Sequence, residues 1–501
     1  MEESKSEKIM NIAKKRAFFY PSSEIYKATA GFWTYGHLGT RIKQKWENLW
    51  RKQFLGLSPY YFEIQDCNIM PEKVFKASGH LEHFNDPLVE CKKCHQRFRA
   101  DNLIEDALKI EAEGLDEKAL TKLIEDNKLL CPKCQGNFDE VKWFNMMFDV
   151  KVGATDTETL YLRPETAQSP FLAFKKEFEA LRKRLPFGLA VIGKAYRNEI
   201  SPRQGFFRLR EFTQAELQIF FDPDNIDEHE DFNDVKDYKV LLKLSKNKTV
   251  KEYTCEDVNK KLEIPKFYVY HMAQIQKFYF EELEIPKAKF RFRELNEKER
   301  AFYNKIHFDI ELDMESLHGF KEVAGLHYRG DHDLGGHQKG SNEKMEVMIG
   351  DKRVLPHVLE LSFGVDRHVW ALMDINYQED KERTFFKFPT LIAPFDVAVF
   401  PLVNKERLPK ISKDIFKDLT KEFNVFYDDK ASIGKRYRRQ DEVGTKYCIT
   451  VDFDSEKDKT VTLRERDSME QVRIKIDQLK PTLLALKYDA MDFKKVGKKV
   501  K

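Results

Sequence analysis

Two pairs of cysteines have the spacing of metal ligands. Cys91 and Cys94 form one Cys-x-x-Cys unit, and Cys131 and Cys134 form a second. Each unit can present two thiolates to one side of an ion, and four such ligands close a tetrahedral zinc site that leaves no position open to substrate. Four unrelated thiols are the alternative, but two such units are rare by chance. The sequence therefore predicts a structural Zn²⁺ site.

A stretch rich in arginine lies between residues 189 and 221. An apolar strand ends near Tyr196, a polar loop with Pro202 and Gly205 follows, and a second strand comes next, which predicts a long hairpin. Because side chains alternate along a strand, one face of the second strand collects charged, amide and aromatic groups. Guanidinium groups hold phosphate oxygens and a ring stacks on a base, so the hairpin predicts a nucleotide platform; a solvated, charged strand edge is the alternative. The platform residues are Arg208, Arg210, Phe212, Gln214, Glu216 and Gln218, with Arg197, Glu199 and Arg203 beside them.

A strand and a helix meet within residues 354–373. Glu360 and Ser362 share one face of the strand, Gly364 permits a tight turn, and Arg367 falls in the first turn of the helix. The helix dipole disfavours a cation at that end, so a bound ligand explains Arg367 better than helix stability does. An exposed arginine after an ordinary turn is the alternative.

Composition and missing motifs exclude other classes of protein. Neither G-x-G-x-x-G nor G-x-x-x-x-G-K-[ST] occurs, so no dinucleotide fold or P-loop is predicted. No stretch reaches the roughly 18 apolar residues of a membrane helix, and we expect a soluble, cytoplasmic protein with no membrane partner. The 87 basic and 84 acidic side chains nearly cancel, which restricts any nucleic-acid contact to a local patch. Histidines crowd residues 307–357, but their spacing matches no common rule for metal ligands.

Length and charge divide the chain into domains. A chain of 501 residues that is 41% hydrophobic holds too much apolar material for one core. Residues 391–501 carry a net charge of +6 (25 basic minus 19 acidic residues), and their alternating patterns predict an α/β module after a boundary near Pro389. Before it, two polar excursions at about 88–140 and 225–300 are too charged to be core strands and indicate insertions. The first predicts two amphipathic helices broken at Gly114.

Several of these segments resemble motifs of the class II aminoacyl-tRNA synthetases. RNEISPRQGFFRLREF at 197–212 looks like motif 2 of this class, and ELSFGVDR at 360–367 looks like motif 3. PSSEIYKATAGFWTYGHLG, ASGHLEHFNDPLVEC and YLRPETAQ resemble the glycyl members, of the homodimeric eukaryotic and archaeal type. The resemblance implies an α+β fold. An antiparallel-sheet catalytic domain with helical and zinc insertions would span 1–389, and a C-terminal α/β anticodon-binding domain would span 390–501.

The resemblance implies a two-step ligase reaction. Glycine and ATP give glycyl-adenylate and pyrophosphate, and the glycyl group then moves to the terminal adenosine of tRNA(Gly). No protein nucleophile is needed, so the catalyst mainly orients substrates and stabilises phosphate charge. Arg197 would hold the α-phosphate and the glycine carboxylate, Arg208 the γ-phosphate. Phe212 and Arg367 would sandwich the adenine, and Glu199 would read its amino group.

The same resemblance implies the remaining ligands of the substrates. Three acids in one pocket are costly unless a cation binds there, which favours a role in holding the glycine ammonium. Glycine, the smallest amino acid, can be selected by filling the space of a side chain, so no editing site is needed. The ATP site would also include Asn198, Leu209, Glu322 and Val323; Glu322 and Glu360 would hold Mg²⁺; and the glycine site would comprise Glu165, Arg197, Glu216, Glu360 and Ser362.

The tail and the motif 1 region carry further expectations. A basic run would contact tRNA phosphates through Lys435, Arg436, Arg438 and Arg439, with a solvated charge run as the alternative. The motif 1 region predicts a helix and then a strand ending at Pro71, which in this class builds the interface of a homodimer.

Departures from the family pattern at Trp33, Thr34, His37 and Ser169 are expected near the substrate entrance. Two rivals remain. A synthetase for another amino acid is disfavoured by the acid trio with Ser362, and a non-catalytic nucleic-acid-binding subunit is disfavoured by the motif arginines.

Overall fold

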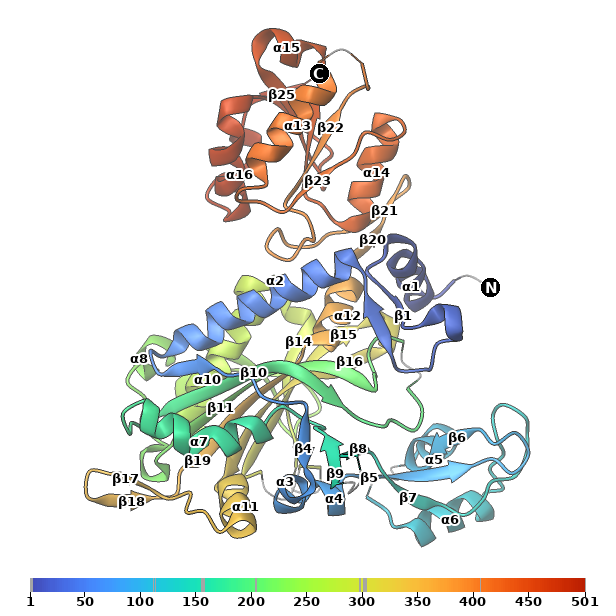
Figure 1. Ribbon diagram of the computed structural model, residues 1–501, viewed down its shortest axis with the longest axis vertical. Helices are drawn as coiled ribbons and strands as arrows, with labels where there is room; N and C mark the ends of the chain where they lie inside the picture. The colour runs from blue at the N-terminus through green and yellow to red at the C-terminus, as the bar shows by residue number, and fades with distance from the viewer. Residues whose placement is uncertain are drawn as a thin grey trace.

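The computed structural model describes residues 3–110, 112, 114–154, 158–202, 205–296, 299–300, 304–405 and 407–500. A nine-stranded sheet forms the centre of its larger part (Figure 1). Two neighbouring pairs, β12 with β14 and β10 with β3, are parallel, and the other described pairs of this sheet are antiparallel. The antiparallel catalytic sheet predicted from the sequence is thereby confirmed. In spatial order the strands are β13 (Lys251–Thr254), β12 (Lys239–Lys243), β14 (Phe290–Glu294), β15 (Ile306–Met314), β16 (Gly319–Gly330), β19 (His357–Gly364), β11 (Glu211–Phe221), β10 (Phe187–Tyr196) and β3 (Tyr61–Glu63).

The predicted hairpin is the pair β10 and β11. The two strands pair from Phe187 opposite Phe220 to Tyr196 opposite Glu211. Because β11 begins only at Glu211, Arg208 and Arg210 lie in the connecting loop and not on the strand face where the sequence placed them. Arg203 falls outside the described residues.

Residues 225–300 extend the central sheet, which corrects the sequence prediction that this stretch contains no core strands. β12, β13 and β14 come from it, and alternate residues of its strands, such as Leu242 and Phe292, are fully buried. Their charged neighbours face outward, so the mean composition hid a period-two pattern. The helices α9 (Cys255–Leu262) and α10 (Lys266–Lys277) come from the same stretch.

Helices cover both faces of this sheet. On one face, the buried side chains of α2 (His37–Phe54), α10 and α12 (Val365–Asn376) share a core with Leu217 and Ile219 of β11. On the other face, α7 (Gln168–Ala180) and α11 (His332–Ser341) pack with Phe187 and Phe220. α1 (Lys5–Arg16) and the paired strands β1 (Phe19–Pro21) and β2 (Trp33–Tyr35) lie beside α12.

The cysteine-bearing module spans residues 85–145 and has its own small core. It consists of β5 (Asn85–Glu90), β6 (Arg97–Arg99), α5 (Ala100–Leu108), α6 (Glu117–Asp126) and β7 (Lys142–Asn145), which confirms the two predicted helices. Gly114, between them, has a φ of 80°. A second sheet of β4 (Ile69–Pro71), β9 (Glu158–Leu162) and β8 (Phe148–Val152), with α3 (Glu72–Ala77) and α4 (His80–His83), connects the module to the body (Figure 1). The single strand predicted to end at Pro71 is therefore two, β3 and β4.

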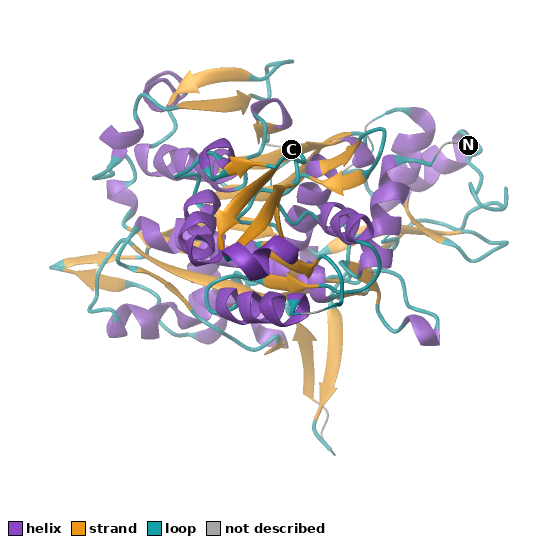
Figure 2. Ribbon diagram, turned by 90° about the horizontal axis from the view of Figure 1, so that it is seen from above, coloured by secondary structure: helices purple, strands orange, loops and turns teal. Residues whose placement is uncertain are grey.

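The C-terminal part is an α/β unit with a separate core, as the sequence predicts. Helices pack on both faces of its six-stranded sheet (Figure 2). Arg383 reaches across to it, with its Nη1 2.8 Å from Asp441 Oδ2. The strands, in spatial order, are β23 (Val425–Tyr427), β22 (Val397–Pro401), β24 (Tyr447–Val451), β25 (Thr460–Glu465), β26 (Gln471–Lys475) and β27 (Lys498–Lys499), and the helices are α13 (Leu408–Leu419), α14 (Ile433–Val443), α15 (Phe453–Asp458) and α16 (Leu479–Lys487).

The short helix α8 (Phe232–Val235) and two-stranded ribbons complete the described α-helices and strands. No helix among the described residues is long and apolar enough to cross a membrane. The ribbons are β17 (Val347–Ile349) with β18 (Lys352–Val354), and β20 (Tyr377–Glu379) with β21 (Thr384–Phe386).

Candidate active site

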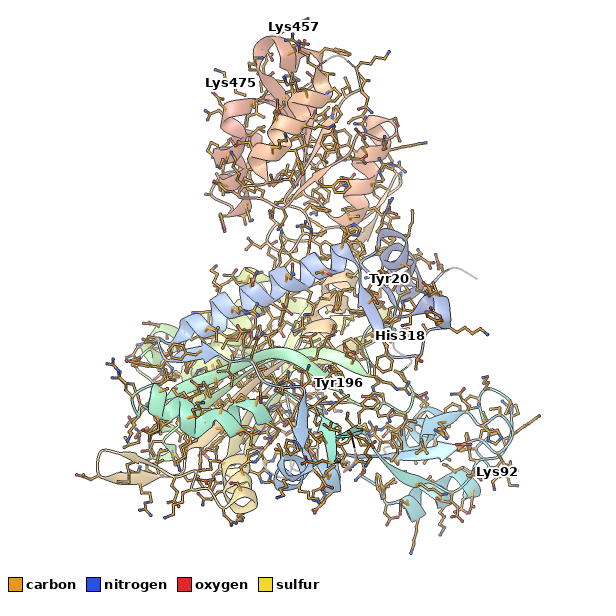
Figure 3. All side chains as sticks on the ribbon, in the orientation of Figure 1. Tyr20, Lys92, Tyr196, His318, Lys457 and Lys475 are labelled. Carbon is orange, nitrogen blue, oxygen red and sulfur yellow. The ribbon has the colours of Figure 1, made fainter. Side chains whose placement is uncertain are left out.

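A cleft of about 230 Å³ opens where β11, β16 and β19 meet the loop after β10. It collects nearly all of the substrate residues predicted from the sequence. Figure 3 labels Tyr196, the last residue of β10, and Lys92, which lies between the first two cysteines. The predicted residues that line the cleft are Glu165, Arg197, Glu199, Arg208, Leu209, Phe212, Glu216, Glu322, Val323, Glu360, Ser362 and Arg367.

Asn198 is the predicted ATP residue that does not line the cleft. Its backbone N–H donates instead to the carbonyl of Met146, at 2.8 Å. The family departures also lie elsewhere, because Trp33, Thr34, His37 and Ser169 are not among the described lining residues. Ser169 is buried and accepts a hydrogen bond from Arg163 Nη1 at 3.2 Å. Trp33 packs edge to face against Phe206, the neighbour of the cleft residue Phe207, so a place near the entrance stays a prediction for these positions.

Cations gather at one end of the cleft. The guanidinium of Arg367 lies 5.2 Å from the ring centroid of Phe207, and its Nη1 lies 3.1 Å from Glu322 Oε1. Arg208 Nε lies 3.6 Å from Glu199 Oε2. Both arginines thus face acids whose place a bound nucleotide would take, its phosphate at Arg208 and its adenine at Arg367. Phe207 was missed by the sequence analysis, although it stands directly before Arg208.

The start of α12 is fixed to the hairpin by Asp366. Its carboxylate accepts a hydrogen bond from the backbone N–H of Thr213 on β11 and another from the Tyr35 hydroxyl. An acid in the first turn also suits the helix dipole. The buried Asp366 thereby sets the direction in which the neighbouring Arg367 leaves the helix.

Glutamates gather at the opposite end, and Glu216 is at the centre of them. Its buried carboxylate accepts hydrogen bonds from Ser362 Oγ at 2.6 Å, Thr166 Oγ1 at 2.7 Å and Gln214 Nε2 at 2.9 Å. Burial, and then the nearby charges of Glu360 and Glu165, raise the pKa of Glu216 to about 7. Among the described residues no cation lies within ion-pair distance of this carboxylate, and Arg163 acts on it only at longer range.

Arg329 neutralises the other two acids. Its Nη1 lies 3.1 Å from each oxygen of Glu360, and its Nη2 lies 3.8 Å from Glu165 Oε1. Burial alone would raise the pKa of Glu360, but Arg329 and His327 outweigh it and lower that pKa to about 2. Against the same effect of burial, His80 and Arg329 hold the pKa of Glu165 well below its usual range. The sequence analysis named none of these cations as part of the site.

Glu360 does not fit the predicted role of a magnesium ligand. Both of its oxygens already accept hydrogen bonds from Arg329, and His327 Nδ1 and Gln218 Nε2 also contact them. The positive guanidinium at this distance repels a divalent cation, which makes Glu360 a weaker magnesium ligand than its sequence position suggests. Glu322 is different, because its carboxylate is half exposed at the mouth of the cleft.

The four predicted cysteines form one cluster. All four sulfurs lie within 4.8 Å of one another, with Cys91 to Cys134 at 3.4 Å and Cys94 to Cys131 at 3.7 Å. Tetrahedral zinc with Zn–S bonds of about 2.3 Å requires sulfurs roughly 3.8 Å apart, so the donor set fits this metal.

The two Cys-x-x-Cys units also have the same backbone. The residue after the second cysteine of each unit has a positive φ, 53° for His95 and 57° for Gln135, and donates its N–H to the carbonyl of the first cysteine. A Cβ at Gly136 would lie 3.1 Å from Cys91 Sγ, so a small residue is required there.

The basic run in the C-terminal unit lies on α14. Lys435, Arg438 and Arg439 line a groove beside the N-terminal helix α1. Arg436, however, is buried and donates to the carbonyls of Pro401 and Leu402. The prediction that Arg436 contacts tRNA is therefore wrong, because every fourth residue of this helix faces the core.

Comparison with known proteins agrees with this architecture. Residues 148–376 match the tRNA synthetase class II core domain family (G, H, P, S and T), and residues 396–486 match the anticodon binding domain family. The fold and the cleft are thus those of a class II aminoacyl-tRNA synthetase.

Relatives that align over nearly the whole chain identify the family within this class. The glycine–tRNA ligase of Thermococcus kodakarensis is 39% identical over 97% of this chain and 99% of its own. That of Pyrococcus furiosus is 40% identical, over 96% and 98%, and that of Methanothermobacter thermautotrophicus is 36% identical, over 96% and 99%. The chain belongs to the glycine–tRNA ligase family.

Proposed function

We propose that this enzyme activates glycine with ATP and transfers the glycyl group to tRNA(Gly). The observation that carries the proposal is the division of charge in the cleft. Arginines are gathered at one end, and Glu216, a buried glutamate without a directly paired cation, lies at the other. A zwitterion between them places its carboxylate toward the arginines and its ammonium on Glu216, which is the orientation that attack on ATP requires.

The protein contributes orientation and charge stabilisation. The glycine carboxylate attacks the α-phosphorus, the bond to the bridging oxygen breaks, and pyrophosphate leaves. Arg197 would stabilise the charge that develops on the α-phosphate oxygens, and Arg208 would hold the leaving phosphates. Phe212 and Phe207 with Arg367 offer flat surfaces for the adenine.

Magnesium would be held by Glu322 and the ATP phosphates. The half-exposed carboxylate of Glu322 is the hard oxygen ligand that Mg²⁺ prefers, whereas the hydrogen bonds from Arg329 to Glu360 disfavour a second contact there. When bound, the ion neutralises charge on the phosphate oxygens.

Zinc would be the resident of the Cys91, Cys94, Cys131 and Cys134 cluster. Four thiolates leave no coordination position for substrate, so the ion would stabilise the cysteine-bearing module and take no chemical step. Metal analysis of reduced protein should return one equivalent of zinc.

The tRNA would contact the C-terminal unit through Lys435, Arg438 and Arg439. Arg439 already pairs with Asp428 and donates to the Lys430 carbonyl, so Lys435 and Arg438 are the stronger candidates. Phosphate contacts of this kind make binding dependent on salt.

A homodimer is supported by the motif 1 region. β3 is an edge strand of the central sheet; its Phe62 is 40% exposed, and Ile69 at the start of β4 is 39% exposed. Light scattering should give twice the chain mass of 59.3 kDa. An enzyme of this function would act in the cytoplasm.

Exchange of pyrophosphate into ATP tests the activity directly. The rate should depend on glycine and not on proline, serine, threonine or histidine. Arg367→Ala should abolish it, whereas the matched control Arg353→Ala, on the distant strand β18, should leave it unchanged. Exchange that responds to another amino acid, or to none, contradicts the proposal.

A further inference from the structure

A short segment at the root of the cysteine-bearing module contacts both ends of the cleft. It consists of α4 and Phe84, which precede β5, and β5 leads directly to Cys91. His80 Nε2 lies 3.6 Å from Glu165 Oε2 at the glutamate end. The ring of Phe84 lies 5.3 Å from the Arg197 guanidinium at the arginine end.

Phe84 and Phe212 flank Arg197. The guanidinium carbon of Arg197 is 5.3 Å from each ring centroid, and its Nε donates to the carbonyl of Pro164 at 3.1 Å. Two rings restrict the plane of the guanidinium, and they do so without occupying the N–H groups that a phosphate needs.

The backbone ties the same two segments together. Phe84 accepts a hydrogen bond from the Met146 N–H at 3.1 Å, and Met146 accepts one from the Asn198 N–H at 2.8 Å. Asn198 follows Arg197, so the root of the module holds the arginine through both its ring contact and its neighbouring peptide.

His80 and Phe84 form one unit. Their rings pack edge to face, with centroids 5.7 Å apart and planes at 63°. The Ser78 hydroxyl lies 2.7 Å from His80 Nδ1 on the far side of the ring, so Nε2 is left to face Glu165. A displacement of the segment would therefore disturb Arg197 at the arginine end of the cleft and Glu165 at the glutamate end.

We propose that His80 and Phe84 are positioning residues for adenylate formation. Phe84 orients Arg197 toward the phosphate, and His80 orients Glu165 toward the ammonium. The inference rests on the proposed function and extends it, because it makes the cysteine-bearing module part of the amino-acid activation step.

Separate kinetic parameters test the two contacts. Phe84→Leu keeps an apolar side chain but removes the ring, and it should lower kcat for glycine-dependent exchange about tenfold. The KM for glycine should rise by a smaller factor, because Arg197 also holds the glycine carboxylate. Phe84→Trp keeps a ring and should restore most of the rate. His80→Ala should raise the KM for glycine several-fold at nearly constant kcat. The control Leu120→Val, in the core of the module, should leave both parameters unchanged.

The results that overturn the inference are specific. The inference is contradicted if Phe84→Leu has the parent's rate, or if Phe84→Trp is as slow as Phe84→Leu. It is also contradicted if Phe84→Leu and His80→Ala change the same kinetic parameter and both lose zinc. ATP affinity without glycine is measured in the same proteins. Parent protein that binds ATP but shows no glycine-dependent exchange contradicts the proposed function instead, and equal ATP affinity in the parent and Phe84→Leu then contradicts the role of Phe84 independently.

Discussion

The raised pKa of Glu216 predicts how glycine use depends on pH. The site needs the ionised carboxylate, because only that form pairs with the ammonium of glycine. With a pKa of about 7 in the free enzyme, about ten elevenths of the molecules carry the charge at pH 8 and about one eleventh at pH 6. The value of kcat/KM for glycine, which reports the free enzyme, should therefore fall about tenfold between these two pH values.

The other two acids do not contribute to this change. The cations around Glu165 and Glu360 lower their pKa values, so both stay ionised over this range. The titration of His327 must be distinguished from that of Glu216, because the hydrogen bond of His327 to Glu360 raises its pKa against the effect of burial. Glu216→Gln distinguishes the two residues: the slope between pH 6 and 8 should disappear, and any slope that remains belongs to His327.

Exchange assays at saturating ATP, from pH 6 to 8 at constant ionic strength, measure the effect. Glu216→Gln at pH 8 should resemble the parent at pH 6 or be slower. A parent enzyme whose kcat/KM for glycine is constant from pH 6 to 8, or a Glu216→Gln variant with the same slope as the parent, would refute the assignment of Glu216 to the ammonium.

Four other outcomes are expected. Without glycine, the parent should lose about 3 kcal/mol of stability between pH 4 and pH 8 that Glu216→Gln does not lose, seen as a steeper fall of Tm with pH: the raised pKa of folded Glu216 favours folding below the ordinary glutamate pKa, and this contribution is lost as the pH rises through about 7. Arg367→Ala should abolish adenylate formation but leave tRNA affinity within about twofold, as filter binding would show. Cys134→Ser should remove zinc and lower Tm, and a variant that keeps one equivalent of zinc contradicts the site. Lys435→Ala with Arg438→Ala should weaken tRNA binding and reduce its salt slope by about 2, while exchange stays unchanged.

The platform and its residues were predictable because their signals are local. The hairpin of β10 and β11 follows from alternation and from turn residues within one continuous stretch. Glu360 and Ser362 sit opposite β11 because they share one face of the neighbouring strand. Such features can be predicted from the alternation of side chains along a strand alone.

Arg329 was not predictable because its role depends on partners far along the chain. It reaches Glu165 on one side and Glu360 on another, and Asp333 fixes its remaining N–H groups at 2.7 and 2.9 Å. No spacing rule connects these positions. A buried arginine within a histidine-rich run was the only local signal, and that run resembled a solvated loop.

Arg436 shows the opposite error. Its basic neighbours indicated a surface patch, but the buried residues of α14 include Arg436, Gln440 and Val443, which follow the inward face of a helix. Helical periodicity, applied to the run, separates Arg436 from Lys435 and Arg438. Charge composition alone does not, since a buried guanidinium can be satisfied by backbone carbonyls.

The acids that pair with the arginines in the free enzyme connect ATP binding to magnesium binding. Arg367 lies 3.1 Å from Glu322, and Arg208 lies 3.6 Å from Glu199. If phosphate oxygens and adenine take over these arginines, as proposed, both carboxylates would lose their nearest cation. Glu322 would then be available to a divalent cation at the triphosphate, and Glu199 would have a free acceptor for the adenine amino group. The free cleft thus pairs these two carboxylates before the nucleotide binds, whereas Glu216 has no directly paired cation.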